Sequence, residues 1–279
     1  MSSFKNILIP IDLSINTEML VKKALELADG DTTIHLLFVE DNGISGLFRA
    51  LKKYMTDEGK FIRKQEIKRK MDVLKIRMEE SCKNIKVCNW IVVANSVQNS
   101  IRDKALQLGV DLIIISKNNN HSWFPFLNRV IPSMLVKKTG IAVLTLTAHA
   151  SDNKVRNVVI PIIGNDSVQL KMDMISNLCK KFKLNIHLLT FTRGNDDNND
   201  LNVSSFLQAY QCLKLYNNCN LEYAVLYGDN KAKAILKYAE KIQADILIVH
   251  PGSETEIGWP NKNITDMVPT ASRMHVLAV

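Results

Sequence analysis

One phrase occurs twice in the chain and limits what it can fold into. Residues 7–11 read Ile-Leu-Ile-Pro-Ile and end at Asp12, and residues 158–162 repeat them as Val-Val-Ile-Pro-Ile. A short apolar run closed by turn-forming residues is typical of a strand buried on both faces, such as a central parallel strand. The copies differ at one informative position, because Ile163 stands where the first copy has Asp12.

The order of elements repeats as well. In the first half, hydrophobic patterns predict helices at residues 16–28 and 97–108 and from about residue 132. They predict further strands at residues 33–39, 87–94, 111–116 and 142–146. The second half echoes these strands at 185–189, 245–249 and 275–279. Strands that alternate with helices predict two repeated five-stranded, mainly parallel, doubly wound α/β domains of the Rossmann-like kind. We place them at 1–149 and 150–279, around a polar linker.

Bulk properties suit a folded protein of two domains. The chain has 279 residues, of which 46% are hydrophobic and 23% charged, and each half can bury a core of its own. No apolar run approaches the roughly 18 residues of a membrane span, and the N-terminus lacks a signal-peptide core. The five cysteines form no CxxC pair, so we expect no disulfide framework and a reduced, cytoplasmic protein without a membrane contact.

The net charge of +8 is concentrated in one segment. Residues 49–86 hold 13 basic and 6 acidic residues, whereas residues 150–279 hold 14 and 13. Within this basic segment, apolar residues recur at helical spacing, at Ile67, Met71, Leu74 and Met78. This pattern predicts a helical insertion with a solvated basic face, with a site for an acidic protein partner as the alternative. Nucleic-acid binding is not favoured, because the charge lies in one insertion rather than along a groove.

Four stretches together carry a family resemblance: Ile-Leu-Ile-Pro-Ile-Asp-x-Ser at 7–14, Ile-His-Leu-Leu-Phe-Val at 34–39, Asp-Leu-Ile-Ile-Ile-Ser at 111–116, and Ser133 followed by Val143-Leu144. In them the chain resembles the universal stress protein family in its tandem two-domain form. The resemblance implies an adenine-nucleotide α-hydrolase-like fold whose two halves pack as an intramolecular pseudo-dimer, with a further homodimer as an option. It also implies ATP or AMP as the ligand of many members.

The resemblance implies where a nucleotide would bind. Family members use an acidic residue after strand one, the backbone at the end of strand two, and a glycine-rich loop after strand four that leads to a helix start. Glycines there let the backbone approach phosphate, and the helix start supplies free N–H groups. Carried onto this sequence, the candidate positions are Asp12, Val39, Ser116, Asn119 and Ser133 in the first half, and Gly228 and Gly252 in the second.

The glycine pattern is largely missing. In the first half its positions hold Asn119, Ser122 and Pro132, and in the second only Gly252 fits. We therefore predict a non-enzymatic stress-response or regulatory protein with degenerate nucleotide loops. The alternative is a genuine ATP- or AMP-binding member with slow or no hydrolysis. A tight turn is the simpler explanation of Gly228.

The remaining polar and aromatic residues give no catalytic or metal-binding set. His35 and His187 lie at equivalent positions inside strands and are predicted to be structural. His121 and His250 follow the fourth strand of each half and should face the crevice at the carboxyl ends of the strands, where an open parallel sheet binds its ligands. Large aromatics also follow the fourth strands, at Trp123 and Trp259. We expect them to fill space left by a lost nucleotide, or else to anchor a protein partner.

Overall fold

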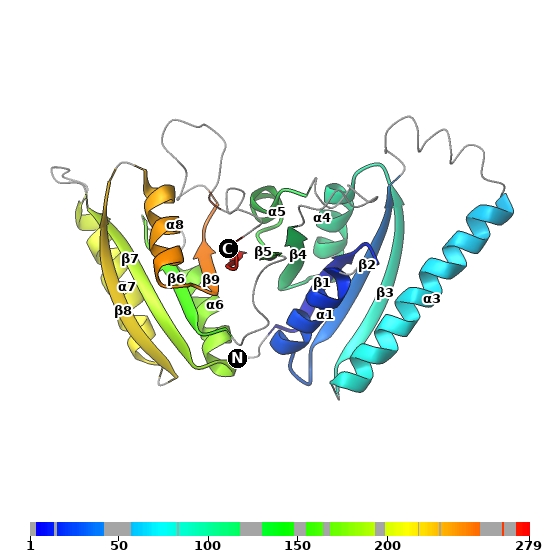
Figure 1. Cartoon of the computed structure of the whole chain (residues 1–279), viewed down its shortest axis with the longest axis horizontal. Coiled ribbons are helices and arrows are strands. Elements are labelled where there is room, and N and C mark those ends of the chain that lie inside the picture. The colour runs from blue at the N-terminus through cyan, green and yellow to red at the C-terminus, as the bar shows by residue number, and fades with distance from the viewer. Residues whose placement is uncertain are drawn as a thin grey trace. The chain divides into compact units, whose positions relative to one another are not determined.

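The computed structural model describes residues 4–13, 16–41, 57–82, 84–117, 130–147, 155–163, 168–192, 199–216, 218–228, 230–251, 264 and 272–279. The chain divides into two compact units, Met1–Ile131 and Pro132–Val279. The division precedes the boundary expected at residue 149, so the last helix and strand of the first repeat group with the second unit. The fold is α/β with alternating helices and strands, as the sequence predicts (Figure 1).

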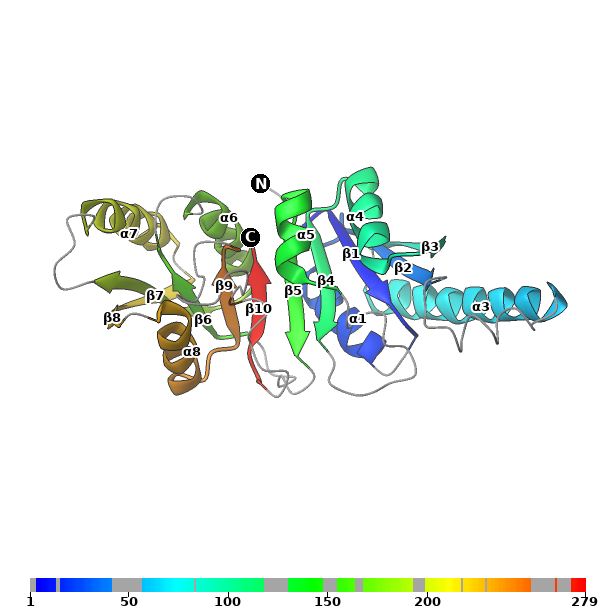
Figure 2. The same cartoon turned by 90° about the horizontal axis from the view of Figure 1, so that it is seen from above.

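Unit 1 is a parallel sheet in the order β3-β2-β1-β4. Its elements are β1 (Asn6–Ile11), α1 (Asn16–Leu27), β2 (Thr33–Asp41), α3 (Asp57–Ser81), β3 (Lys86–Ala94), α4 (Val97–Leu108) and β4 (Leu112–Lys117). Figures 1 and 2 show α1 and α3 on one face of this sheet and α4 on the other, which is the doubly wound arrangement. The central position of β1 explains its continuous apolar sequence, since both of its faces are covered.

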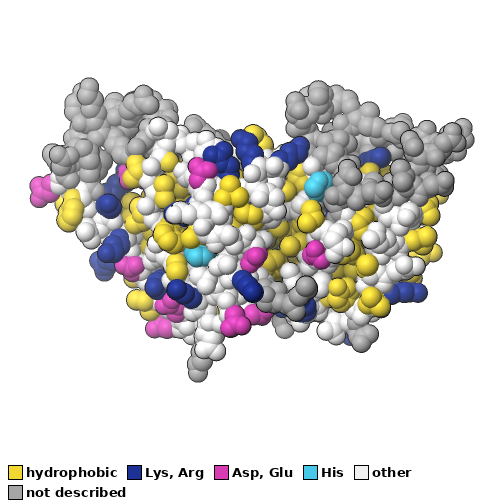
Figure 3. Space-filling view, turned by 180° about the vertical axis from the view of Figure 1, so that it is seen from behind, with side chains coloured by type: hydrophobic (Ala, Val, Ile, Leu, Met, Phe, Trp, Pro, Cys, Tyr) yellow, Lys and Arg dark blue, Asp and Glu magenta, His cyan; other side chains and the backbone are white. Residues whose placement is uncertain are grey.

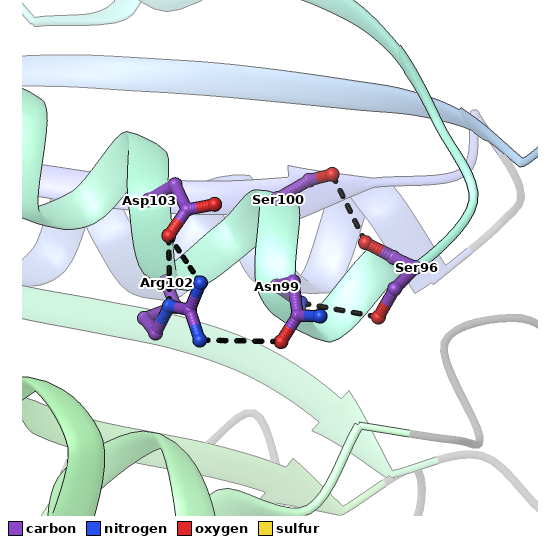
Figure 4. Close-up of polar contacts among 5 residues, drawn as sticks. All are labelled: Ser96, Asn99, Ser100, Arg102 and Asp103. Carbon is purple, nitrogen blue, oxygen red and sulfur yellow. Dashed lines mark hydrogen bonds and ion pairs between the residues drawn. The ribbon is translucent and has the colours of Figure 1, made fainter.

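The ends of α4 are fixed by local sequence. Ser96 adopts an extended backbone and its side chain accepts a hydrogen bond from the Asn99 N–H, while Gly109 ends the helix at φ 56°. Ser100 Oγ donates to the Ser96 carbonyl at 3.0 Å, and Arg102 contacts Asp103 at 2.7 Å (Figure 4). These contacts lie within the first two turns, so the helix begins where the capping residues predict.

Unit 2 has the order β5-β10-β9-β6-β7-β8. Its elements are α5 (Pro132–Thr139), β5 (Ala142–Thr147), β6 (Asn157–Pro161), α6 (Val168–Lys181), β7 (Leu184–Thr192), α7 (Asn199–Lys214), β8 (Cys219–Tyr227), α8 (Lys231–Lys241), β9 (Ile246–Val249) and β10 (His275–Ala278). Neighbouring strands are parallel except β10 and β5, which are antiparallel with Leu277 opposite Leu144. The last strands of the two repeats therefore pair with each other within unit 2.

One aspartate in each repeat anchors the start of its central strand. Asp111 Oδ2 accepts the N–H groups of Lys5 and Asn6, both at 2.8 Å. Asp245 Oδ2 accepts those of Arg156 and Asn157, also at 2.8 Å. Since β1 and β4 are neighbours, as are β6 and β9, the carboxylate ties the amino ends of two adjacent strands together. The recurrence of this residue in the sequence thus has a structural cause.

The long helix predicted in the basic segment is confirmed. α3 spans 25 residues and buries Ile67, Met71 and Met78 on the side that packs toward β3. Its basic side chains lie mainly on the exposed sides of the helix. Residues 49–56 of the segment lie outside the described residues.

Candidate functional site at the carboxyl edge of the first sheet

The turn after β1 lies where an open parallel sheet places its ligands, between two neighbouring strands at their carboxyl ends. Asp12 is half-buried there, and Thr17 Oγ1 donates to its Oδ1 at 3.5 Å. The next residue, Leu13, has φ 59°, a left-handed backbone that costs a residue with a Cβ atom about 1–2 kcal/mol. Strain of this kind is concentrated at ligand-binding turns, although Asp12 also has an internal partner that supports the start of α1.

The end of β2 borders the same crevice. β1 pairs with β2 only as far as Ile11 opposite Phe38, whereas β2 continues to Asp41 alongside β3. The main chain of residues 39–41 therefore extends beyond the last residue pair between β1 and β2. The Val39 side chain is buried, so its main chain is the part that can face a ligand.

The predicted site residues are only partly brought together. Ser116, near the end of β4, joins Asp12 and Val39 at one edge of the strands β2, β1 and β4, and it is half-buried. Ser133 is the second residue of α5, is buried, and belongs to unit 2. Gly228 follows the outermost strand β8, with β7 between it and β6, and its φ of 124° is a backbone reason for glycine. Asn119 and Gly252 lie outside the described residues.

A groove opens beside the Asp12 turn. It has a volume of about 450 Å³ and is lined by the start of α1 and by one side of α3: Leu13, Thr17, Glu18, Glu66, Arg69, Lys70, Val73, Leu74 and Arg77. Lys70 pairs with Glu66 at 2.8 Å, and this hydrogen bond and charge lower the pKa of the Glu66 carboxyl. Sequence reasoning missed the groove, because it treated the basic segment and the first strand separately. The spacing of residues 66, 70, 73 and 77 along one helix side was the available signal.

The equivalent edge of unit 2 is built differently. Ile163 lies in a hydrophobic cluster with Phe191 and Ile264, and all three are buried. With the repeats aligned on their prolines, Lys171 of α6 takes the position of Leu20, and it is fully buried. Its Nζ donates to the Pro161 carbonyl at the end of β6, at 2.7 Å. An apolar cluster and a buried amine therefore occupy the strand end where the first half has a carboxylate, and the sequence analysis did not single out Lys171.

The strand histidines are held inside the sheets. Trp90 Nε1 donates to His35 Nδ1 at 3.2 Å, and His35 Nε2 lies 3.4 Å from Asn6 Oδ1. His187 contacts the Tyr238 hydroxyl at 3.2 Å. Burial lowers the pKa of both imidazoles, with nearby lysines adding to the effect at His35. These contacts agree with the predicted structural roles.

The other predicted features are resolved only in part. His250 Nδ1 donates to the main-chain oxygen of Val279 at 2.5 Å, which ties the end of β9 to the end of β10. His121, Trp123 and Trp259 lie outside the described residues. Within the described part of the chain, no group of three His, Cys, Asp or Glu side chains is placed to hold a metal ion. No helix among the same residues is long and apolar enough to cross a membrane.

Residues 3–124 match the model of the universal stress protein family. Similar solved structures cover nearly the whole chain. A universal stress protein from Archaeoglobus fulgidus DSM 4304 has 14% identity and a TM-score of 0.67, with 98% of this chain and 95% of that one covered. A putative universal stress protein from Pseudomonas aeruginosa UCBPP-PA14 has 16% identity, a TM-score of 0.56, and coverage of 99% and 93%.

A third likeness comes from a different kind of protein. The cytoplasmic domain of a prokaryotic cation chloride cotransporter has 12% identity, a TM-score of 0.56, and coverage of 98% and 94%. No curated protein matches the sequence. Because all three structures are below 25% identity, they establish the fold that both halves share with universal stress proteins. Ligands and partners have to be argued from this chain's own residues.

Proposed function

We propose that this chain is a tandem universal stress-type protein that acts as a non-enzymatic regulator in the cytoplasm, with nucleotide binding weakened in the first half and lost in the second. The observation that carries the proposal is the filled carboxyl edge of unit 2. Ile163 there is 8% exposed and packs in a hydrophobic cluster, where a nucleotide would need a polar contact. The five cysteines are all free, which supports a reducing compartment.

A second candidate function is adenine-nucleotide binding in the first half. It is favoured by the shared edge of Asp12, Val39 and Ser116 and by the groove beside them. Arg69 and Arg77 line that groove and can attract an anionic ligand. Under both candidate functions, the second half of the chain has a structural or regulatory role and binds no nucleotide.

Nucleotide content separates these candidates. The purified full chain is heat-denatured and its supernatant is analysed by mass spectrometry for ATP and AMP, and calorimetry then titrates each nucleotide into the protein. The proposal expects less than stoichiometric nucleotide and affinity weaker than micromolar. One nucleotide per chain, bound with micromolar affinity that Asp12→Ala abolishes, would establish the second candidate instead.

A matched variant guards against an indirect effect of the Asp12 change. Asp31 is exposed and precedes β2, at the opposite edge of the same sheet, so Asp31→Ala should leave any binding unchanged. Two nucleotides per chain would contradict both candidates, because it would require a site at the edge that Ile163 fills.

A further inference from the structure

β8 is the outermost strand of unit 2, and among the described residues it pairs only with β7. One hydrogen bond shows to which side each residue of β8 points its main-chain N–H and C=O groups. Leu184 lies opposite Cys219, and the Leu184 N–H donates to the Asn218 carbonyl. In a parallel pair this means that even-numbered residues of β8 turn their polar groups toward β7. The odd-numbered residues, from Cys219 to Tyr227, present their N–H and C=O groups outward.

The side chains of these same odd-numbered residues make the edge apolar. Tyr223 is 63% exposed and Tyr227 74%, with Val225 exposed between them. Phe206 and Tyr210 of α7 contact the Tyr223 ring, and Val203 and Leu207 of the same helix are exposed. Figure 3 views unit 2 from the side of α7, where hydrophobic side chains reach the surface along its outer margin. An unpaired edge bordered by aromatic and aliphatic side chains is a ready template for another strand.

The corresponding strand of unit 1, β3, has an outward N–H group that a helix side chain caps. Val87 of β3 points its N–H outward, but the Glu79 carboxylate of α3 accepts it at 3.1 Å. Asp72 of the same helix accepts a hydrogen bond from the side-chain amide of Asn89, Nδ2, at 2.9 Å. α3 has 25 residues and reaches along β3, whereas α7 has 16, and in the described part of unit 2 no side chain caps an outward N–H of β8. α3 thus supplies an acceptor for an outward N–H of β3, whereas the described part of unit 2 supplies none for β8.

We propose that β8 is an interface for a second copy of this chain, with the two β8 strands antiparallel and centred on Tyr223. In this register Tyr223 faces its own copy, Leu221 faces Val225, and Cys219 faces Tyr227. All of these are residues with outward polar groups, so the strands would form about ten main-chain hydrogen bonds, two for each such pair. Val203 and Leu207 of the two α7 helices would flank the joined strands on one face.

Charge favours a second copy of the chain as the partner, and it favours the register centred on Tyr223. Glu222 is the single charged residue of β8. Centring the pair on Tyr223 places Glu222 opposite Ala224, whereas centring it on Glu222 would oppose two carboxylates, which is destabilising. Unit 2, residues 132–279, carries 16 basic and 13 acidic residues, so its net charge of +3 is the smaller share of the chain's +8 and opposes the approach of two copies less than unit 1 would.

The test measures the mass of the full chain across micromolar concentrations by sedimentation equilibrium. Wild type should be a dimer, and Tyr227→Lys should raise its dissociation constant on the order of tenfold or more, because a lysine on an edge strand opposes pairing. Val93→Lys is the matched control, since Val93 holds the equivalent position on β3 and is 55% exposed. It should leave the dimer intact.

The register is tested by Tyr223→Cys. A residue at the two-fold centre lies opposite itself, within the Cα separation that a disulfide spans, so this variant should become a covalent dimer under mild oxidation. A wild-type chain that stays monomeric, a dimer unaffected by Tyr227→Lys, or one lost equally through Val93→Lys would overturn the proposal. Failure of Tyr223→Cys to cross-link an otherwise confirmed dimer would overturn its register.

Discussion

Replacing Asp245 with alanine should destabilise unit 2 by an amount that the geometry allows us to estimate. One carboxylate oxygen accepts two N–H groups at 2.8 Å, from Arg156 and Asn157. A hydrogen bond to a charged group contributes about 1.5–3 kcal/mol. The Arg156 bond is exposed, so water can replace it at small cost, whereas the Asn157 bond is partly buried. We therefore expect Asp245→Ala to lower the free energy of unfolding by about 2–4 kcal/mol.

Asparagine at the same position separates charge from geometry. Asp245→Asn keeps an acceptor oxygen of the same shape but removes the charge, so it should cost about half as much, roughly 1–2 kcal/mol. Urea unfolding followed by circular dichroism gives the change, and hydrogen exchange at β6 shows whether it is confined to unit 2. Asp111→Ala is the matched variant, since Asp111 binds Lys5 and Asn6 with the same geometry in unit 1.

Two results would refute this reasoning. If both alanine variants unfold within about 0.5 kcal/mol of wild type, the carboxylates contribute no more than an ordinary surface residue. If asparagine costs as much as alanine, the effect comes from the negative charge alone and the two short N–H contacts are not its origin.

Two other predictions follow from ionisable groups. The pKa of His35 is lowered, first by burial and then by Lys86 and Lys104, so below about pH 6.5 the unfolded chain binds more protons than the folded one. The free energy of unfolding should therefore reach a plateau above that pH and fall as the pH drops below it. His35→Gln should flatten this pH dependence, measured by urea titrations at several pH values. An unchanged slope would contradict the assignment to His35. Burial and the neighbouring Cys219 raise the pKa of the Cys179 thiol to about 12, so about one molecule in 10⁴ carries the thiolate at pH 8. Iodoacetamide followed by mass spectrometry should modify the half-buried Cys82 long before Cys179, and equal rates would contradict this.

The sequence predicted the fold well because its signals were local and repeated. Apolar runs closed by turn residues located the central strands, and the spacing of Ile67, Met71 and Met78 located the long helix. The aspartate before the fourth strand was visible as a repeat, but its role needed the hydrogen bonds to the neighbouring strand. Such contacts join residues about 90–105 positions apart, which no local pattern reveals.

The candidate site was harder to predict, because it depends on which helix side faces which turn. Asp12, Val39 and Ser116 lie at one edge of the sheet because parallel topology brings strand ends together whatever the side chains are, and their role as a site stays a prediction. The groove beside them depends on the packing angle of α3, and its lining residues looked like an ordinary solvated helix face. Lys171 was overlooked for a related reason: a lysine within an amphipathic helix is usually exposed, and only the packed structure shows it buried.

The two repeats share a backbone but expose different surfaces. In unit 1 the outer strand is covered by α3, while the carboxyl edge of the sheet keeps a carboxylate, a strained turn and a groove. In unit 2 Ile163 and its cluster fill the carboxyl edge, and the shorter α7 leaves β8 with outward polar groups. A sheet edge and a strand-end crevice suit different partners, because one binds another strand through its backbone and the other binds a small molecule through side chains. The duplicated fold therefore supports a division of labour in which the first half can meet a ligand and the second half can meet another chain.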